Sequence, residues 1–112
     1  MALGIDIVYI PRFYGKEKLA KRILSTEEYA IYEHRLNKEE FIAGRFAAKE
    51  AFLKAYRDGI GRISFTSISI VYREDGRPVL MYNDKFYNVS ISHDGDYAVA
   101  VVEVKDWYDR TI

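Results

Sequence analysis

Residues 3–9 form a run that is apolar except for Gly4 and Asp6, and this run predicts a β-strand. Pro11 ends the strand, because proline cannot continue the hydrogen-bond ladder. Within it Ile5 and Ile7 share one face, so Asp6 points to the other. A carboxylate on such a strand costs free energy unless it is paired or binds a metal ion. Asp6 is therefore either a structural residue with hydrogen-bond partners or part of a site.

The next part of the chain has helical periodicity. We predict helices over residues 16–24, 25–35 and 39–57. Ser25 followed by Glu28 is typical of a capping box at the start of the second helix. The third is the strongest, and its side chains at helical spacing are Phe41, Ile42, Arg45, Phe46 and Lys49. Gly59 is placed to end it.

After residue 62 the period changes to two, which predicts strands over 63–73, 78–82, 86–92 and 97–104. Residues 74–77 form a turn, and Asp94-Gly95 indicates a tight hairpin. The last strand is apolar on both faces, so we expect it to be central and covered. Helices followed by a meander predict an α+β fold, with the long helix packed on an antiparallel sheet.

Composition limits the class of protein. At 112 residues we expect a single domain over 1–112, and 49% hydrophobic with 30% charged residues argues against disorder. The longest uncharged run, residues 63–72, is about half the length that spans a bilayer. Residues 1–6 lack the basic start of a signal peptide. We therefore expect a cytoplasmic protein that has no membrane partner.

The scarcity of cysteine and histidine limits the kinds of metal site that the chain can form. There is no cysteine and there are only two histidines, which argues against disulfides, Cys nucleophiles and zinc sites. A metal ion would have to be held by carboxylates, which favours a hard ion such as Mg²⁺.

The net charge is zero, with 17 basic and 17 acidic residues, which argues against a nucleic-acid partner. The charge is unevenly distributed, since residues 1–57 carry 11 basic and 8 acidic side chains and the rest carry 6 and 9. The extreme is residues 12–22, where the cations Arg12, Lys16, Lys18, Lys21 and Arg22 accompany only Glu17. This basic segment is either a solvated helix face or a docking surface for an acidic partner.

A second candidate carboxylate, Glu50, lies on the long helix. Glu50 and Lys54 are spaced i, i+4, which is typical of a surface ion pair. The alanines around Glu50 would let another element or a ligand approach, and the same helix carries the cations Arg45, Lys49, Lys54 and Arg57. A strand carboxylate, a helix carboxylate and nearby cations suit Mg²⁺-diphosphate chemistry.

The remaining candidates have simple structural interpretations. His93 shares a strand face with Val89 and Ile91, as a core or rim histidine would. Residues 59–61 (GIG) form a helix stop, or let backbone amides approach a ligand. Asp94 and Asp96 fit turn positions.

Taken in order, these motifs resemble the small, trimeric class of 4′-phosphopantetheinyl transferases, the bacterial holo-[acyl-carrier-protein] synthases. The resemblance rests on residues 4–8 (GIDIV), 41–55 (FIAGRFAAKEAFLKA), 59–61 (GIG) and 89–93 (VSISH) followed by Tyr97 and Ala98. It covers nearly the whole chain. The helix motif about 40 residues after the strand aspartate makes it specific.

The resemblance implies that the chain transfers phosphopantetheine from coenzyme A to a serine of apo acyl carrier protein, releasing adenosine 3′,5′-bisphosphate, as a step in fatty acid biosynthesis. Asp6 and Glu50 match the Mg²⁺ ligands and Lys54 matches the lysine on the diphosphate; these three are the catalytic candidates. The coenzyme A candidates are Arg45, Lys54, Gly59, Gly61 and His93, and the carrier-protein docking candidates are Arg12, Lys16 and Arg22. The family also implies a homotrimer with sites between subunits.

Two positions depart from the family pattern, since Tyr9 stands where Glu is common and Asp94 where Ser is usual. The proton of the attacked serine could be taken by Glu50, Asp6 or a metal-bound water. Other classes of protein remain as alternatives. One is a non-catalytic module that binds coenzyme A or a carrier protein, which loss of Asp6, Glu50 or Lys54 would favour. Another is an RNA-binding domain, which ten tyrosines favour and the zero net charge opposes.

Overall fold

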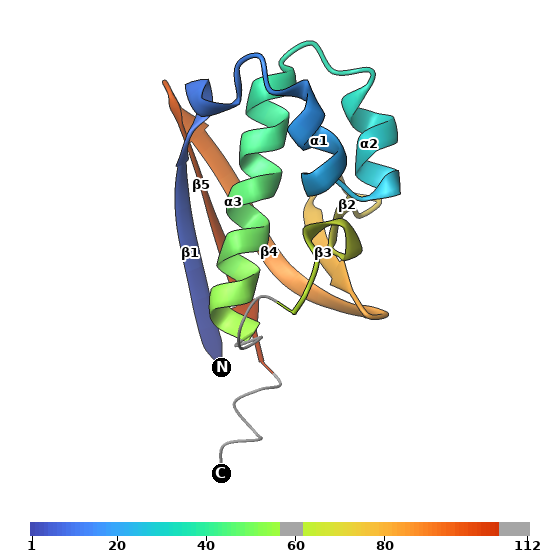
Figure 1. The fold of residues 1–112 in the computed structure, drawn as a ribbon. Coiled ribbons are helices and arrows are strands. Elements are labelled where there is room, and N and C mark those ends of the chain that lie inside the picture. Colours follow the sequence, from blue (N-terminus) through green and yellow to red (C-terminus); the bar gives the residue numbers. More distant parts are fainter. Residues whose placement is uncertain (57–61, 106–112) are drawn as a thin grey trace.

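The computed structural model describes residues 1–56 and 62–105, and it contains a five-stranded antiparallel sheet with helices packed on one face (Figure 1). The elements in chain order are β1 (Ala2–Tyr9), η1 (Ile10–Phe13), α1 (Glu17–Ile23), α2 (Thr26–Tyr32), α3 (Lys38–Tyr56), η2 (Phe65–Ser67), β2 (Ser69–Tyr72), β3 (Pro78–Tyr82), β4 (Lys85–Asp94) and β5 (Tyr97–Val104). The strand order is β1-β5-β4-β3-β2. The predicted α+β class is confirmed.

Local sequence signals account for several element boundaries. The capping box forms as predicted, because the Ser25 side chain accepts from the Glu28 backbone N–H and the Glu28 side chain accepts from the Ser25 N–H. Helix α2 ends at Tyr32, earlier than predicted. The turn between β4 and β5 is tight, with Gly95 at a φ of 56°. Gly59 and Gly61 lie outside the described residues.

The strand predicted over residues 63–73 is wrong in its first half. A 3₁₀ turn, η2, occupies Phe65–Ser67, and only Ser69–Tyr72 pairs as a strand. The Ser64 Oγ accepts from the Thr66 backbone N–H at 3.3 Å, and the Ser67 hydroxyl donates to the Ser64 carbonyl at 2.6 Å. Such local side-chain bonds compete with a strand ladder, and here they prevail.

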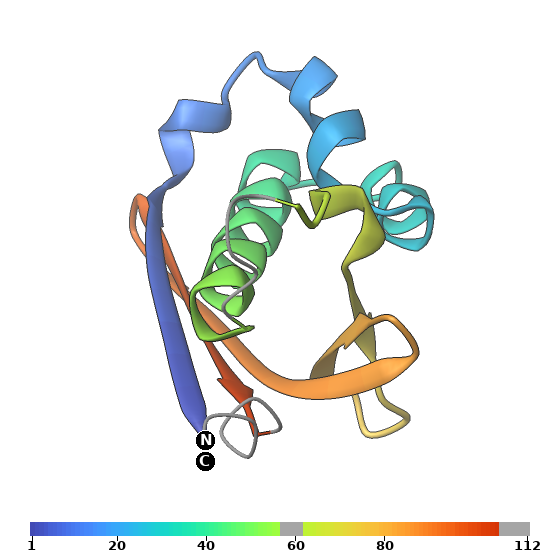
Figure 2. The same cartoon turned by 60° about the horizontal axis from the view of Figure 1, so that its bottom comes forward.

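The sheet curls around α3, as Figure 2 shows. Strands β1 and β5 make the closest approach, against a helix face built from small residues such as Ala51 and Ala55, both fully buried. At Gly4 a Cβ atom would lie only 1.8 Å from the Ala51 carbonyl oxygen. Only glycine therefore fits at this position, and the backbones of β1 and α3 can touch.

The outer face of the sheet carries apolar side chains that no described element covers. Leu3, Ile5 and Ile7 of β1 are 65%, 62% and 64% exposed, and Tyr97 and Val101 of β5 extend this face. The prediction that β5 is central holds, since it lies between β1 and β4, but the prediction that both of its faces are covered is wrong for the single chain. The physical reason is that the helices all pack on the opposite side of the sheet.

Candidate active site

The structure brings Asp6 of β1 and Lys54 of α3 together at the seam between strand and helix. The Lys54 ammonium donates to the Asp6 carboxylate oxygen Oδ1 at 3.0 Å and to the Ile5 carbonyl at 2.9 Å. The Asp6 side chain is 16% exposed and that of Lys54 is 55% exposed. Lys54 therefore bridges two elements, whereas the surface-pair interpretation placed it on Glu50 within one helix.

Glu50 belongs to the same seam, as its electrostatics indicate. Partial burial raises the pKa of the Glu50 carboxyl, the negative charge of Asp6 raises it further, and Lys54 opposes the shift. Two carboxylates are thus close enough to repel one another, and a bound cation would relieve that repulsion. The described residues contain no group of three or more His, Cys, Asp or Glu side chains that could hold a metal ion. A two-carboxylate site fits Mg²⁺, which usually keeps water and substrate phosphates as its other ligands.

Arg45 and His93 line a separate groove of about 540 Å³. Its other lining residues are His34, Arg35, Leu36, Asn37, Glu40, Phe41, Gly44, Tyr72, Pro78 and Ile91. The Arg45 guanidinium is buried, donates through Nη2 to the Tyr72 hydroxyl at 2.8 Å and lies 3.9 Å from the centre of the Phe41 ring. His93 is a rim residue, about half exposed, with its Nε2 3.3 Å from the carboxylate of Glu40. The groove is therefore lined by four cationic or titratable side chains, His34, Arg35, Arg45 and His93, and by one acidic side chain, Glu40.

The seam and the groove are different places on a single chain. Arg45 and Glu50 are five residues apart on α3, which separates them by roughly 7.5 Å along the axis and about 140° around it. None of the seam residues lines the groove. On one chain the two groups of candidate residues therefore lie apart.

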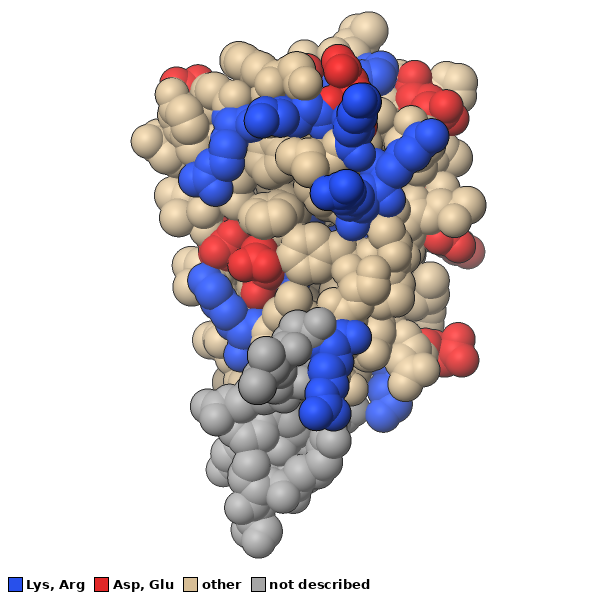
Figure 3. All heavy atoms as spheres, in the orientation of Figure 1, with Lys and Arg blue, Asp and Glu red and all other residues tan. Residues whose placement is uncertain are grey.

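The basic segment lies on the surface of η1 and α1. Arg12, Lys16 and Arg22 are all exposed. Figure 3 shows Lys and Arg side chains gathered over the upper part of this face, above acidic side chains at the β1–α3 seam. Glu17 in the first turn of α1 and Arg22 in its last turn also match the helix dipole, as the solvated-face interpretation would have it.

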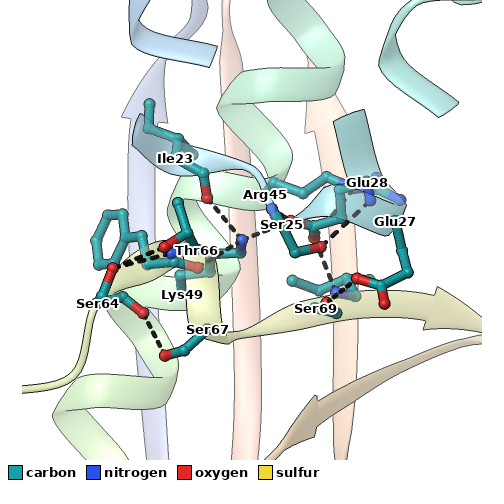
Figure 4. Close-up of polar contacts among 12 residues, drawn as sticks. Ile23, Ser25, Glu27, Glu28, Arg45, Lys49, Ser64, Thr66, Ser67 and Ser69 are labelled. Atoms are coloured by element: carbon teal, nitrogen blue, oxygen red, sulfur yellow. Dashed lines mark hydrogen bonds and ion pairs between the residues drawn. The ribbon is translucent and has the colours of Figure 1, made fainter. Parts of the chain in front are cut away.

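Sequence reasoning counted Lys49 among the cations available to a phosphate, and this is wrong. Lys49 is fully buried, and its ammonium donates to the Ile23 carbonyl, the Phe65 carbonyl and the Glu28 carboxylate (Figure 4). Burial lowers the pKa of Lys49, and the charge of Glu28 opposes the shift. The signal was present, since Lys49 continues the apolar stripe that begins at Phe41.

Sequence patterns did not indicate Arg35 and Tyr72 as lining residues of the groove, nor Glu28 as the buried partner of Lys49. Arg35 and Tyr72 come from an irregular loop and a short strand, and no spacing in the sequence joins them to Arg45. Glu28 was identified only as a capping residue.

Comparisons with known proteins identify the family of this chain. The profile of the 4′-phosphopantetheinyl transferase superfamily matches residues 2–102. A holo-[acyl-carrier-protein] synthase from Geobacillus sp. is 43% identical over 94% of this chain and 96% of its own length. The corresponding enzyme from Staphylococcus saprophyticus is 41% identical over 89% and 93%.

Solved structures agree with these sequence relatives. A holo-(acyl-carrier-protein) synthase from Bacillus anthracis, in complex with CoA (3′,5′-ADP), has a TM-score of 0.80 and 38% identity, covering 90% of this chain and 92% of its own. The Helicobacter pylori synthase in complex with coenzyme A has a TM-score of 0.79 and 36% identity, covering 92% and 99%. The chain therefore belongs to the 4′-phosphopantetheinyl transferase superfamily.

Proposed function

We propose that this chain is a holo-[acyl-carrier-protein] synthase, which transfers the 4′-phosphopantetheine group from coenzyme A to a serine of apo acyl carrier protein and releases adenosine 3′,5′-bisphosphate. The observation that carries the proposal is the seam, where Asp6, Glu50 and Lys54 come together on a fold shared with relatives of that name. A non-catalytic module has no need of these three residues.

At the seam, Asp6 and Glu50 would hold Mg²⁺. A bound ion would supply positive charge that offsets the negative charge of the diphosphate of coenzyme A. Lys54 supplies a second positive charge, and its bond to the Ile5 carbonyl orients the ammonium beside Asp6. The half-exposed Lys54 side chain leaves this charge open to a phosphate.

The groove is proposed to bind the phosphates of coenzyme A. Arg45 and His93 would contact the phosphates, the 3′-phosphate in particular, with Arg35 and His34 close by. Gly59 and Gly61 stay predictions for the same ligand. Because the seam and the groove are separate on one chain, a complete site would form between the seam of one subunit and the groove of a neighbour.

A second copy of this chain is the partner that fits the uncovered outer face of the sheet, hereafter the bare sheet face. The apolar side chains of β1 and β5 on that face form a contiguous exposed patch, and a chain of this size gains from covering such a patch. Three copies around a threefold axis would bury the face and complete three sites.

Carrier-protein docking is proposed for the basic segment. Arg12, Lys16 and Arg22 are exposed on or beside η1 and α1. Figure 3 shows Lys and Arg side chains on the same face as acidic side chains beside β1 and α3, so an acidic partner bound to these cations would lie on the face of the seam. Among the described residues, no helix combines the length and apolar character needed to cross a membrane. The cytoplasmic location stays a prediction.

Incubation with coenzyme A, Mg²⁺ and apo acyl carrier protein tests the function. We expect the carrier protein to gain the mass of one phosphopantetheine group, and chelation of Mg²⁺ to abolish the gain. Omitting coenzyme A is the control. Binding of both substrates without any mass gain would favour the non-catalytic module.

A further inference from the structure

Glu28, Lys49 and Arg45 form a buried three-charge cluster between the helices and β2 (Figure 4). The Glu28 carboxylate is fully buried, and both of its oxygens have partners. Its Oε1 accepts from the Ser25 N–H at 2.9 Å and from the Lys49 ammonium at 2.5 Å, and its Oε2 accepts from the Ile70 N–H at 2.8 Å. Glu28 is thereby fixed in one position.

Lys49 uses all of its hydrogen-bonding capacity inside the protein. An ammonium has three donors. These reach Glu28, the Ile23 carbonyl at 2.7 Å and the Phe65 carbonyl at 2.9 Å. The pair therefore ties α3 to α1, α2 and η2, and its charge cannot serve a ligand.

Arg45 is the incompletely paired member of the cluster. Its Nε lies 3.9 Å from the Glu28 Oε2, too far for a hydrogen bond, and within the described part of the chain this buried Nε has no hydrogen-bond partner. With Lys49 and Arg45 positive and Glu28 negative, the cluster keeps a formal charge of +1. That charge lies on the one member that lines the groove.

We propose that Lys49 is a positioning residue that keeps the Arg45 guanidinium available to an anionic ligand in the groove. By holding Glu28, Lys49 prevents that carboxylate from closing on Arg45 and neutralising it. This inference rests on the proposed function, in which the ligand is the phosphate portion of coenzyme A. A buried ion pair is by itself weak evidence of a stabilising role.

Three variants vary the charge of the cluster without touching Arg45. Lys49→Met leaves a formal charge of 0, the double variant Glu28→Gln/Lys49→Met restores +1, and Glu28→Gln alone gives +2. Calorimetric binding of adenosine 3′,5′-bisphosphate is the probe, with thermal unfolding measured for each variant. We expect Lys49→Met to weaken binding about tenfold or more, as for loss of one charged hydrogen bond. The double variant should recover to near wild type, and Glu28→Gln should bind at least as tightly as wild type.

If Lys49 has a purely structural role, the double variant should bind more weakly than Lys49→Met, because the double variant has lost more buried hydrogen bonds than either single one. Equal binding by Lys49→Met and wild type, or no recovery in a folded double variant, would overturn the proposal. If Lys49→Met does not fold, the test is the binding of the bisphosphate by Glu28→Gln. Clearly weaker binding by folded Glu28→Gln than by wild type would overturn the proposal.

A second measurement needs no ligand. The buried Arg45 Nε–H should give its own NMR signal, which we expect to shift when Lys49→Met lets Glu28 approach and to return in the double variant. Failure of the wild-type chain to bind the bisphosphate would contradict the proposed function of the groove. In that case an unshifted Arg45 signal overturns the positioning role, and a reversible shift supports it.

Discussion

Asp6, Glu50 and Lys54 illustrate how the same residue types acquire a role from their surroundings. Glu50 and Lys54 have the spacing of a surface ion pair, yet Lys54 reaches across to Asp6 on β1. The pKa of Glu50 is then raised by burial and by Asp6. When no metal ion is bound, the seam therefore disfavours the charged form of the Glu50 carboxyl.

The raised pKa of Glu50 leads to a prediction about stability. Because the pKa of Glu50 is raised in the folded state, its contribution to stability is present below the unfolded value of 4.5 and is lost as the pH rises through the folded pKa. At pH 7, in the absence of metal ions, Glu50→Gln should therefore unfold at a higher denaturant concentration than wild type, with the difference vanishing near pH 4.

The same variant should be a poor enzyme. Losing a metal ligand should cost more than the roughly 10–100-fold typical of a residue that only supports a ligand. We expect Asp6→Asn and Glu50→Gln to reduce turnover by at least that much in the mass-gain assay. Near-wild-type turnover at low Mg²⁺ in either variant would contradict the metal assignment.

At the scale of elements, the approach of β1 to α3 determines the geometry of the seam. Gly4 lies two residues before Asp6 on the same strand face, directly against the Ala51 backbone. Any side chain there would move the strand and carry Asp6 away from Lys54.

Gly4→Ala should accordingly destabilise the fold by about 3 kcal/mol, the upper end of the usual range of about 1–3 kcal/mol for overpacking. Gly44→Ala is the matched control, because there the new Cβ meets only the Ile91 side chain at 3.2 Å and the helix gains propensity. Its stability should change by about 1 kcal/mol or less. Denaturant unfolding measures both, and equal effects would mean that the Gly4 contact is not limiting.

The exposed cations of η1 and α1 should act on one substrate only. Replacing Arg12 and Lys16 with Glu should raise the KM for the carrier protein, most strongly at low ionic strength, since exposed charges are screened within about 10 Å at 0.1 M salt. The KM for coenzyme A and the unfolding midpoint should hardly change. Steady-state kinetics over a salt series measures this.

Lys85→Glu, at the first residue of β4, is the control for that charge reversal. Equal effects of the Arg12 and Lys16 replacements on both substrates would assign them to the coenzyme A site. No effect on either would leave the basic segment as a solvated helix face.

At the scale of the whole molecule, the bare sheet face predicts assembly. Ile5→Lys would place a charge in the middle of that face, so we expect light scattering to give a trimer mass for wild type and a smaller mass for the variant. Ala30→Lys is the control, because Ala30 is exposed on α2, which lies on the opposite side of the sheet. A fully active monomeric wild type would contradict both the trimer and the shared site.

The sequence alone was sufficient for the features that depend on nearest neighbours along the chain. Periodicity placed α3 and most strands, Ser25 and Glu28 defined a helix start, and the strand aspartate with the helix motif around Glu50 indicated the family. These signals are local, since hydrogen bonding and side-chain direction repeat within a few residues.

Only the tertiary structure decided which groups meet across elements. It placed Lys54 on Asp6, buried Lys49 against Glu28, separated Arg45 from the seam and left one face of β5 bare. Periodicity shows which side of an element is apolar, but it does not reveal which charges pack together or what covers a second apolar face. Those outcomes depend on the free energy of burying each group with particular partners, and the partners are distant in the sequence.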